Sequence, residues 1–191
     1  MQRRAFLRWL VSGTAALPFR GVRLHAQAAA LSSGSLATLR VLAPAVLPSE
    51  LGAAGHDRVV GDFVQWLASY RSGADRNWGY GHPRKNVLPS INVATYDSQL
   101  TELATAAKAG AGDLTTLPLE VKRTIVAARL DAAGVKSLPG SPNGGHVITD
   151  LLAFYYGSAS ANDLMYRARI GRSTCRGLAG AASKPTSIAG D

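Results

Sequence analysis

Apolar residues recur along this chain at the spacing of an α-helix, and no stretch alternates with the two-residue period of a β-strand. The clearest example is residues 57–71, where one helical face collects Val59, Val60, Phe63, Val64, Leu67 and Tyr70. An amphipathic helix must bury its apolar face against another element. The pattern therefore predicts an all-α fold, a compact bundle of about five helices with long irregular loops and an extended C-terminal tail.

Further segments have apolar residues at helical spacing, and these are residues 36–47, 95–109, 118–133, 146–156 and 162–170. Pro44 lies inside the first of them, so we expect a kink or an early end there. Glycine, alanine, serine and proline residues predict irregular segments between the helices. These segments are residues 51–55, 72–92, 134–145 and 158–161.

The segment 118–133 is apolar on two sides. One strip consists of Leu119, Val126, Leu130 and Ala133, and a second consists of Val121, Ile125, Ala128 and Ala132. Pro118 suits the first helical position, where its missing N–H costs nothing. The two strips predict a central helix, or a helix shared between the core and a partner, and the core is the expected case.

Composition places the chain among compact globular domains. Apolar residues make up 47% of its 191 residues, and no apolar stretch reaches the ~18 residues of a membrane span. The single cysteine excludes a disulfide framework and a cysteine-based zinc site. The net charge is +9, but five of the 21 basic residues lie in the first 28 positions, where there is no acidic residue. The rest of the chain has 16 basic and 12 acidic residues. The excess of basic residues therefore favours a sorting signal over a surface that binds nucleic acid.

Residues 1–28 have the three parts of an export signal, namely a basic start, a short apolar run and a small-x-small site at residues 26–28. The basic start closely resembles the twin-arginine signature, which is carried here by Arg3, Arg4, Phe6 and Leu7. That route transports proteins that are already folded, and such signals are addresses read by a receptor. The alternative is an amphipathic or buried N-terminal helix.

The usual catalytic and ligand-binding motifs are missing from the sequence. Neither the Gly-x-Ser-x-Gly elbow nor a glycine-rich phosphate loop occurs. The histidines His25, His56, His82 and His146 are scattered, without the helical i, i+4 pair of a metal site. His146 stands at a helix start, where a lone histidine is usually structural. We therefore expect no catalytic, cofactor-binding or metal-binding residue in this chain.

Residues 164–176 contain four arginines, a tyrosine, a methionine and the only cysteine. This segment is either a solvated basic helix end or a docking arm, because Arg, Tyr and Met are enriched at interfaces and Arg binds carboxylates in bidentate fashion. Trp66 falls at the edge of the apolar face of residues 57–71, and is either a core-rim aromatic or an anchor for a partner. The predicted partner-binding residues are Trp66, Tyr166, Arg167, Arg169, Arg172, Cys175 and Arg176. An unpaired cysteine in an exported protein suggests a disulfide with a partner or a free thiol, and we expect Cys175 to form the disulfide.

Three features carry a resemblance to a known family. They are the twin-arginine leader, the segment 36–48 followed by a Gly/Ala stretch and a helix, and the helix Asp150–Tyr156 followed by a tail that contains Gly, Cys and Pro. Over most of its length the chain thereby resembles the gluconate 2-dehydrogenase subunit 3 family, the small or gamma subunits of bacterial membrane-associated dehydrogenases. The aromatic, glycine-rich ending of that family is replaced here by residues 172–178.

The resemblance implies a non-catalytic accessory subunit. Its main partner would be a large FAD-dependent oxidoreductase of the glucose–methanol–choline type, which supplies the FAD and the redox chemistry. A cytochrome c subunit is a further implied partner. The chain would lend its signal to the complex, pass through the twin-arginine translocase and act in the periplasm. It would associate with the inner membrane only through the complex or through an uncleaved signal.

The sequence thus divides into a twin-arginine signal (1–28), a helical accessory domain (29–171) and an extended C-terminal docking tail (172–191). Two other functions stay open. One is an independent periplasmic enzyme that uses His82, His146 and loop carboxylates in an unrecognised site. The other is a basic module that binds nucleic acid or anionic lipid surfaces through residues 167–176.

Overall fold

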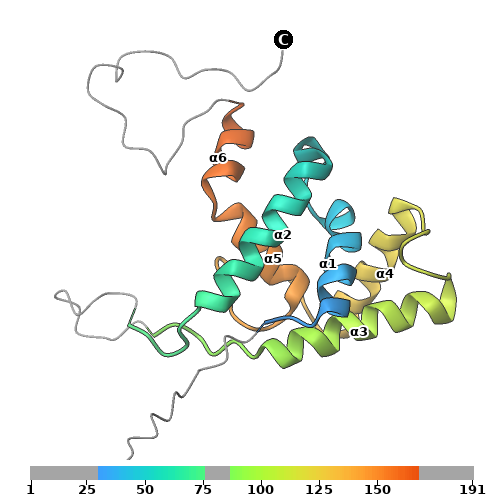
Figure 1. The fold of residues 1–191 in the computed structure, drawn as a ribbon, viewed down its shortest axis with the longest axis horizontal. Helices are drawn as coiled ribbons and strands as arrows, with labels where there is room; N and C mark the ends of the chain where they lie inside the picture. Colours follow the sequence, from blue (N-terminus) through green and yellow to red (C-terminus); the bar gives the residue numbers. More distant parts are fainter. Residues whose placement is uncertain (1–29, 76–86, 168–191) are drawn as a thin grey trace, which may run out of the picture.

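A computed structural model describes residues 30–75 and 87–167 of the chain. These residues form a compact bundle of α-helices without a strand, which confirms the predicted all-α class (Figure 1). The helices are α1 (Ser33–Val46), the short 3-10 helix η2 (Ser49–Leu51), α2 (Gly52–Ser69), α3 (Val93–Gly110), α4 (Leu119–Ala132), α5 (Val147–Tyr156) and α6 (Ala159–Tyr166). Between α2 and α3, an isolated antiparallel bridge joins Asp75 to Val87.

The N-terminal end of α1 is fixed by serine and aspartate side chains. Ser32 caps the helix, since its Oγ accepts a hydrogen bond from the Ser35 backbone N–H at 3.2 Å. The backbone N–H of Ser32 in turn donates to the Asp97 carboxylate on α3 at 3.0 Å. Of the kink or early end predicted at Pro44, the early end is wrong, because α1 continues to Val46. A proline in the last turn removes only one helical hydrogen bond before the chain leaves the helix.

The predicted loop over residues 51–55 is also wrong, because α2 begins at Gly52 directly after η2. Gly52 has a φ of +62°, a backbone conformation that favours glycine. The small residue at position 55 fits closely against the preceding turn, since a Cβ there would lie 2.9 Å from the Leu51 Cβ. His56 closes the turn with a 2.9 Å hydrogen bond between its Nε2 and the Pro48 carbonyl oxygen.

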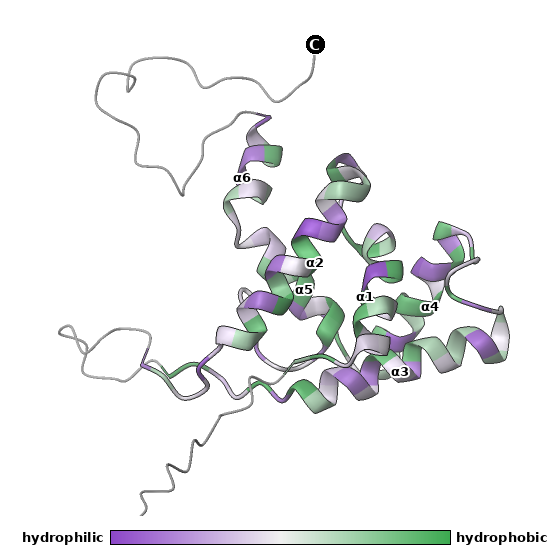
Figure 2. Ribbon diagram, viewed as in Figure 1, coloured by the Kyte–Doolittle hydropathy of each residue, from purple (hydrophilic) through white to green (hydrophobic). Residues whose placement is uncertain are grey.

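The core lies between α1, α2, α3 and α5 (Figure 1). Figure 2 shows α2 with polar and apolar residues alternating along its length, as expected for a helix with one buried face. The most deeply buried helix is α5, of which only three residues are not buried. Side chains with at most 1% exposure in the core include Leu39, Leu42, Val60, Phe63, Tyr96, Leu100, Leu103, Ile148 and Leu151.

The prediction that residues 118–133 form the central helix is wrong. In α4 only Val126 is buried, and Leu119 is 38% exposed. The helix packs against α1 and α3 from the outside, and Arg123 ties it to α1 through a 3.2 Å hydrogen bond from its Nε to the Ala45 carbonyl. Much of the second apolar strip consists of alanines, which add little burial energy. The alternative, a face shared with a partner, stays a prediction.

The last described helix, α6, packs mainly against α5 (Figure 1). The predicted interruption over residues 158–161 is shorter than expected, because Ser158 caps a helix that already starts at Ala159. The Ser158 Oγ accepts a hydrogen bond from the Ala161 backbone N–H at 3.2 Å. The helix ends at Tyr166 instead of Ile170, since Arg167 takes a left-handed φ of +47°.

Candidate functional site

Of the predicted partner-binding residues, the structure describes Trp66, Tyr166 and Arg167, and it also describes His146 of the alternative enzyme site. Trp66 lies near the end of α2, whereas Tyr166 and Arg167 lie at the end of α6. Figure 1 shows these two helix ends apart from each other. The remaining predicted residues lie outside the described ranges. These are Arg3, Arg4, Phe6 and Leu7 of the export signal, His82, and Arg169, Arg172, Cys175 and Arg176 of the tail.

The end of α6 presents apolar side chains to solvent. Met165 is 65% exposed and Tyr166 is 62% exposed. Only Ala161 of α6 is buried. Large apolar side chains that gather at one end of a molecule mark interaction surfaces more often than scattered ones do. We refer to Met165 and Tyr166 as the exposed patch.

Trp66 belongs to an aromatic cluster at the rim of the core, as the core-rim interpretation predicts. Its ring centroid lies 5.8 Å from that of Phe63, 4.8 Å from that of Tyr70 and 5.6 Å from that of Phe154. Phe63 is fully buried, whereas Trp66, Tyr70 and Phe154 are partly exposed. The cluster joins the end of α2 to α5, and its outer rings form a partly open aromatic surface.

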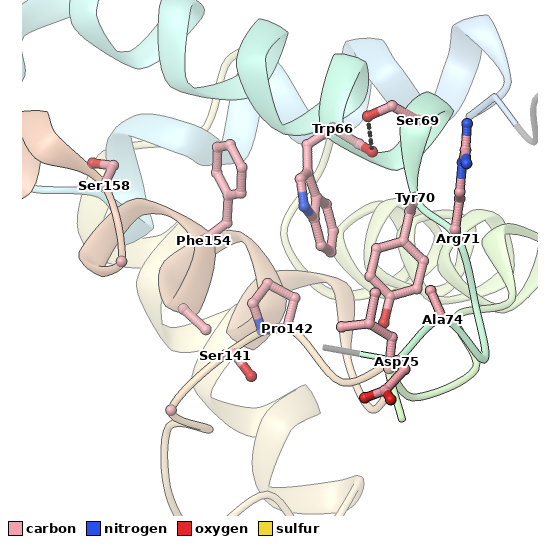
Figure 3. Close-up of a pocket in the computed structure, with 14 residues that line it drawn as sticks. Trp66, Ser69, Tyr70, Arg71, Ala74, Asp75, Ser141, Pro142, Phe154 and Ser158 are labelled. Atoms are coloured by element: carbon pink, nitrogen blue, oxygen red, sulfur yellow. Dashed lines mark hydrogen bonds between the residues drawn. The ribbon is translucent and has the colours of Figure 1, made fainter. Parts of the chain in front are cut away.

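A cleft of about 590 Å³ lies beside this surface, and we call it the aromatic cleft (Figure 3). The contacting rings of Trp66 and Tyr70 from α2 and of Phe154 from α5 form one wall (Figure 3). The loop before α5 contributes Ser141 and Pro142. Clefts of this size with mainly apolar and aromatic walls are the usual form of ligand sites. The remaining lining residues are Ser69, Arg71, Ala74, Asp75, Leu88, Gly140, Ala153, Gly157 and Ser158.

A fully buried carboxylate holds the loop that forms one side of the cleft. Asp150 of α5 accepts hydrogen bonds from the backbone N–H of Asn143 at 3.1 Å and of Gly144 at 2.8 Å. It also accepts a short hydrogen bond from the hydroxyl of Tyr96 on α3. Burial, and then the bond to Asp150, raise the pKa of Tyr96 well above its usual range. A buried carboxylate with three donors is a structural arrangement, because its acceptor oxygens are occupied.

The start of α5 is attached to α3 by a second set of bonds. Gln99 donates from Nε2 to the Gly145 carbonyl at 2.9 Å and accepts at Oε1 from the Val147 N–H at 2.8 Å. His146 caps the helix, since its Nδ1 accepts from the Ile148 N–H at 3.2 Å. Burial lowers the pKa of His146, against the opposing effect of Asp150 and Glu102. These bonds confirm the structural interpretation of His146.

Sequence reasoning did not find Asp150 and Tyr96 as a pair, although it placed both on helices. They are 54 positions apart, and no spacing pattern in the sequence links them. The sequence did contain one indication of this arrangement. Asp150 is an acidic residue within an otherwise apolar helical segment, directly before Leu151, Leu152 and Ala153. A buried carboxylate in such a place requires donors. The sequence alone does not say which residues supply them.

Among the described residues, no group of three or more His, Cys, Asp and Glu side chains is placed to hold a metal ion. No helix within residues 30–75 and 87–167 is both long and apolar enough to span a bilayer. The chain was compared with protein-family models, with curated proteins and with solved structures, and none of them matches it.

Proposed function

We propose that this chain is the non-catalytic small subunit of an exported FAD-dependent dehydrogenase of the glucose–methanol–choline type, specific for a sugar or an alcohol. It binds the folded catalytic subunit in the cytoplasm, carries it through the twin-arginine translocase and stabilises it in the periplasm. The proposal is supported by the twin-arginine signature at Arg3 and Arg4 and by the resemblance to the gluconate 2-dehydrogenase subunit 3 family.

The structural observation that carries the proposal is the exposed patch at the end of α6. This helix adds one buried residue to the core, yet it places Met165 and Tyr166 in water. Exposing two large apolar side chains on a helix that contributes so little to the core is unfavourable for an isolated chain. A partner that covers Met165 and Tyr166 would remove this cost, and Tyr and Met are among the residues enriched at protein interfaces.

The residues that follow the patch indicate the charge of the partner surface. From Leu164 to Gly190 the sequence has four arginines and one lysine and no acidic residue. An acidic surface on the catalytic subunit would complement this charge, and arginine binds carboxylates with two parallel hydrogen bonds. Trp66 is a weaker candidate for a partner contact, because it packs within the aromatic cluster at the core rim.

The need for a shared export signal follows from the cofactor of the partner. FAD is bound as the flavoprotein folds, so such a subunit must cross the membrane in its folded state. The twin-arginine route accepts folded cargo, and one signal suffices for two proteins that are bound to each other. The affinity of the complex therefore determines whether the catalytic subunit is exported.

The proposal predicts that a flavoprotein of this type is encoded next to this chain, and co-purification with it tests the proposal. The double variant Met165→Ser with Tyr166→Ser should reduce the amount of co-purified flavoprotein at least tenfold, since these side chains form the patch. The matched control is Val87→Ser with Leu138→Ser, which removes two exposed apolar side chains elsewhere. The control should co-purify as the unmodified chain does. Equal recovery with both double variants, or no complex with the unmodified chain, would contradict the proposal.

A further inference from the structure

We propose that the aromatic cleft between α2 and α5 is a binding site for an uncharged, flat aromatic small molecule. The inference is independent of the proposed function, because it concerns a different surface from the exposed patch. The cleft volume of about 590 Å³ lies in the range of small-molecule sites and is sufficient for a ligand of two or three fused rings. All the lining residues used below lie within the described ranges.

The class of ligand follows from the rings that form the walls. Figure 3 shows Phe154 on one side of Trp66 and Tyr70 on the other, with Pro142 below them. Aromatic rings prefer to pack against other aromatic rings in offset or edge-to-face geometry, which contributes beyond the burial of area. Several ring surfaces around one cleft therefore favour a flat aromatic molecule over an aliphatic one of equal size.

The walls are positioned before any ligand arrives. The Tyr70 hydroxyl donates to the Pro89 carbonyl at 2.8 Å, which fixes the ring at the edge of the cleft. The Trp66 ring stacks on the buried Phe63 with an interplanar angle of 20°. On the opposite side, Asp150 holds Asn143 and thereby the loop that carries Pro142. A preformed site loses less conformational entropy on binding.

The charged side chains of the cleft lie at its edge. Arg71 extends its guanidinium group away from the aromatic rings, and the Asp75 carboxylate lies at the side of the cleft near Tyr70 (Figure 3). The surface formed by the contacting rings of Trp66 and Phe154 carries no charged group (Figure 3). A charged ligand would lose its hydration there without gaining a partner of opposite charge. The site therefore favours an uncharged molecule.

The test titrates the full chain, labelled with ¹⁵N, with 2-naphthol. We expect a saturable shift of the Trp66 indole N–H signal with a Kd below about 1 mM. The signal is assigned by its loss in Trp66→Phe. The matched probe is decahydro-2-naphthol, which has the same carbon skeleton without aromatic rings, and it should bind at least about tenfold more weakly. No saturable shift with 2-naphthol, or equal affinity for the two probes, would overturn the proposal.

Cleft-filling variants test the location of the site. Ala74→Phe occupies the space beside Tyr70, and Ser141→Phe does so from the loop on the other side, so the result does not depend on either variant alone. Each should weaken 2-naphthol binding at least tenfold while the circular dichroism of the helices is retained. Leu119→Ala, on α4 and outside the cleft, should bind as the unmodified chain does. Unchanged binding in a folded cleft-filling variant would overturn the assignment.

Discussion

Replacing Gly144 with alanine is expected to lower the free energy of unfolding by about 2–5 kcal/mol. Gly144 has a φ of +86°, and a left-handed backbone costs a residue with a Cβ about 1–2 kcal/mol. The new Cβ would lie 2.7 Å from the Ser90 carbonyl oxygen and 3.4 Å from the Ile91 Cα. These are backbone atoms, which cannot rotate away, so overpacking adds about 1–3 kcal/mol. Urea unfolding followed by far-ultraviolet circular dichroism measures the change.

Two other glycines separate these contributions. Gly134 has a φ of +69°, but a Cβ there would meet nothing within 4 Å, so Gly134→Ala should cost only the backbone strain of about 1–2 kcal/mol. Gly61 is exposed within α2 and a Cβ there also meets nothing within 4 Å, so Gly61→Ala should add about 0.5–1 kcal/mol of stability. If Gly144→Ala is as stable as Gly134→Ala, the close approach of this loop to Ser90 is refuted.

The remaining predictions concern three side chains. Tyr96→Phe should cost about 1–3 kcal/mol in urea unfolding, because Asp150 loses a buried donor. Since the pKa of Tyr96 is raised in the folded state, stability should also fall as the pH rises above 10.0, and less so in Tyr96→Phe. The pKa of His146 is lowered in the folded state, so the free energy of unfolding should fall as the pH drops below 6.5. His146→Asn keeps a capping acceptor and should flatten the pH dependence of the free energy of unfolding in this range. Cys175→Ser should abolish a reductant-sensitive band of the native complex in electrophoresis, and identical migration of the unmodified complex with and without reductant would exclude the disulfide.

Local signals were sufficient to predict which segments are helical. The apolar face of residues 57–71 places Val60, Phe63 and Leu67 in the core, where the structure has them. His146 was predicted at a helix start, and it caps α5. Such features depend on residues a few positions apart, so the periodicity of the sequence is enough to find them.

Features that depend on distant residues were predicted poorly. The two apolar strips of α4 suggested a central helix, whereas burial in the fold falls on α5, because helix position is decided by which side chains fill the space between α1, α2 and α3. Tertiary packing outweighs the local pattern in this case. Residues 51–55 read as a loop from their glycines and alanines, yet α2 begins at Gly52, and His56 joins its first turns to Pro48.

The candidate sites show the same contrast between features that depend on local sequence and features that depend on distant residues. Trp66 was predicted at the rim of the core, and the structure places it there. Phe154, whose ring contacts Trp66, and Pro142, which also lines the cleft, come from the other end of the sequence. Their approach depends on the loop that Asp150 and Tyr96 hold in place, which is a long-range arrangement without a local pattern.

Export of the flavoprotein tests the account most directly. This chain and the adjacent flavoprotein are expressed together, and the FAD content of periplasmic and cytoplasmic fractions is measured with Arg3-Arg4 intact and with Arg3→Lys and Arg4→Lys combined. The account predicts that the double replacement retains both proteins in the cytoplasm with FAD bound. A flavoprotein that reaches the periplasm to the same extent with the replaced signal, or without this chain, would contradict the account.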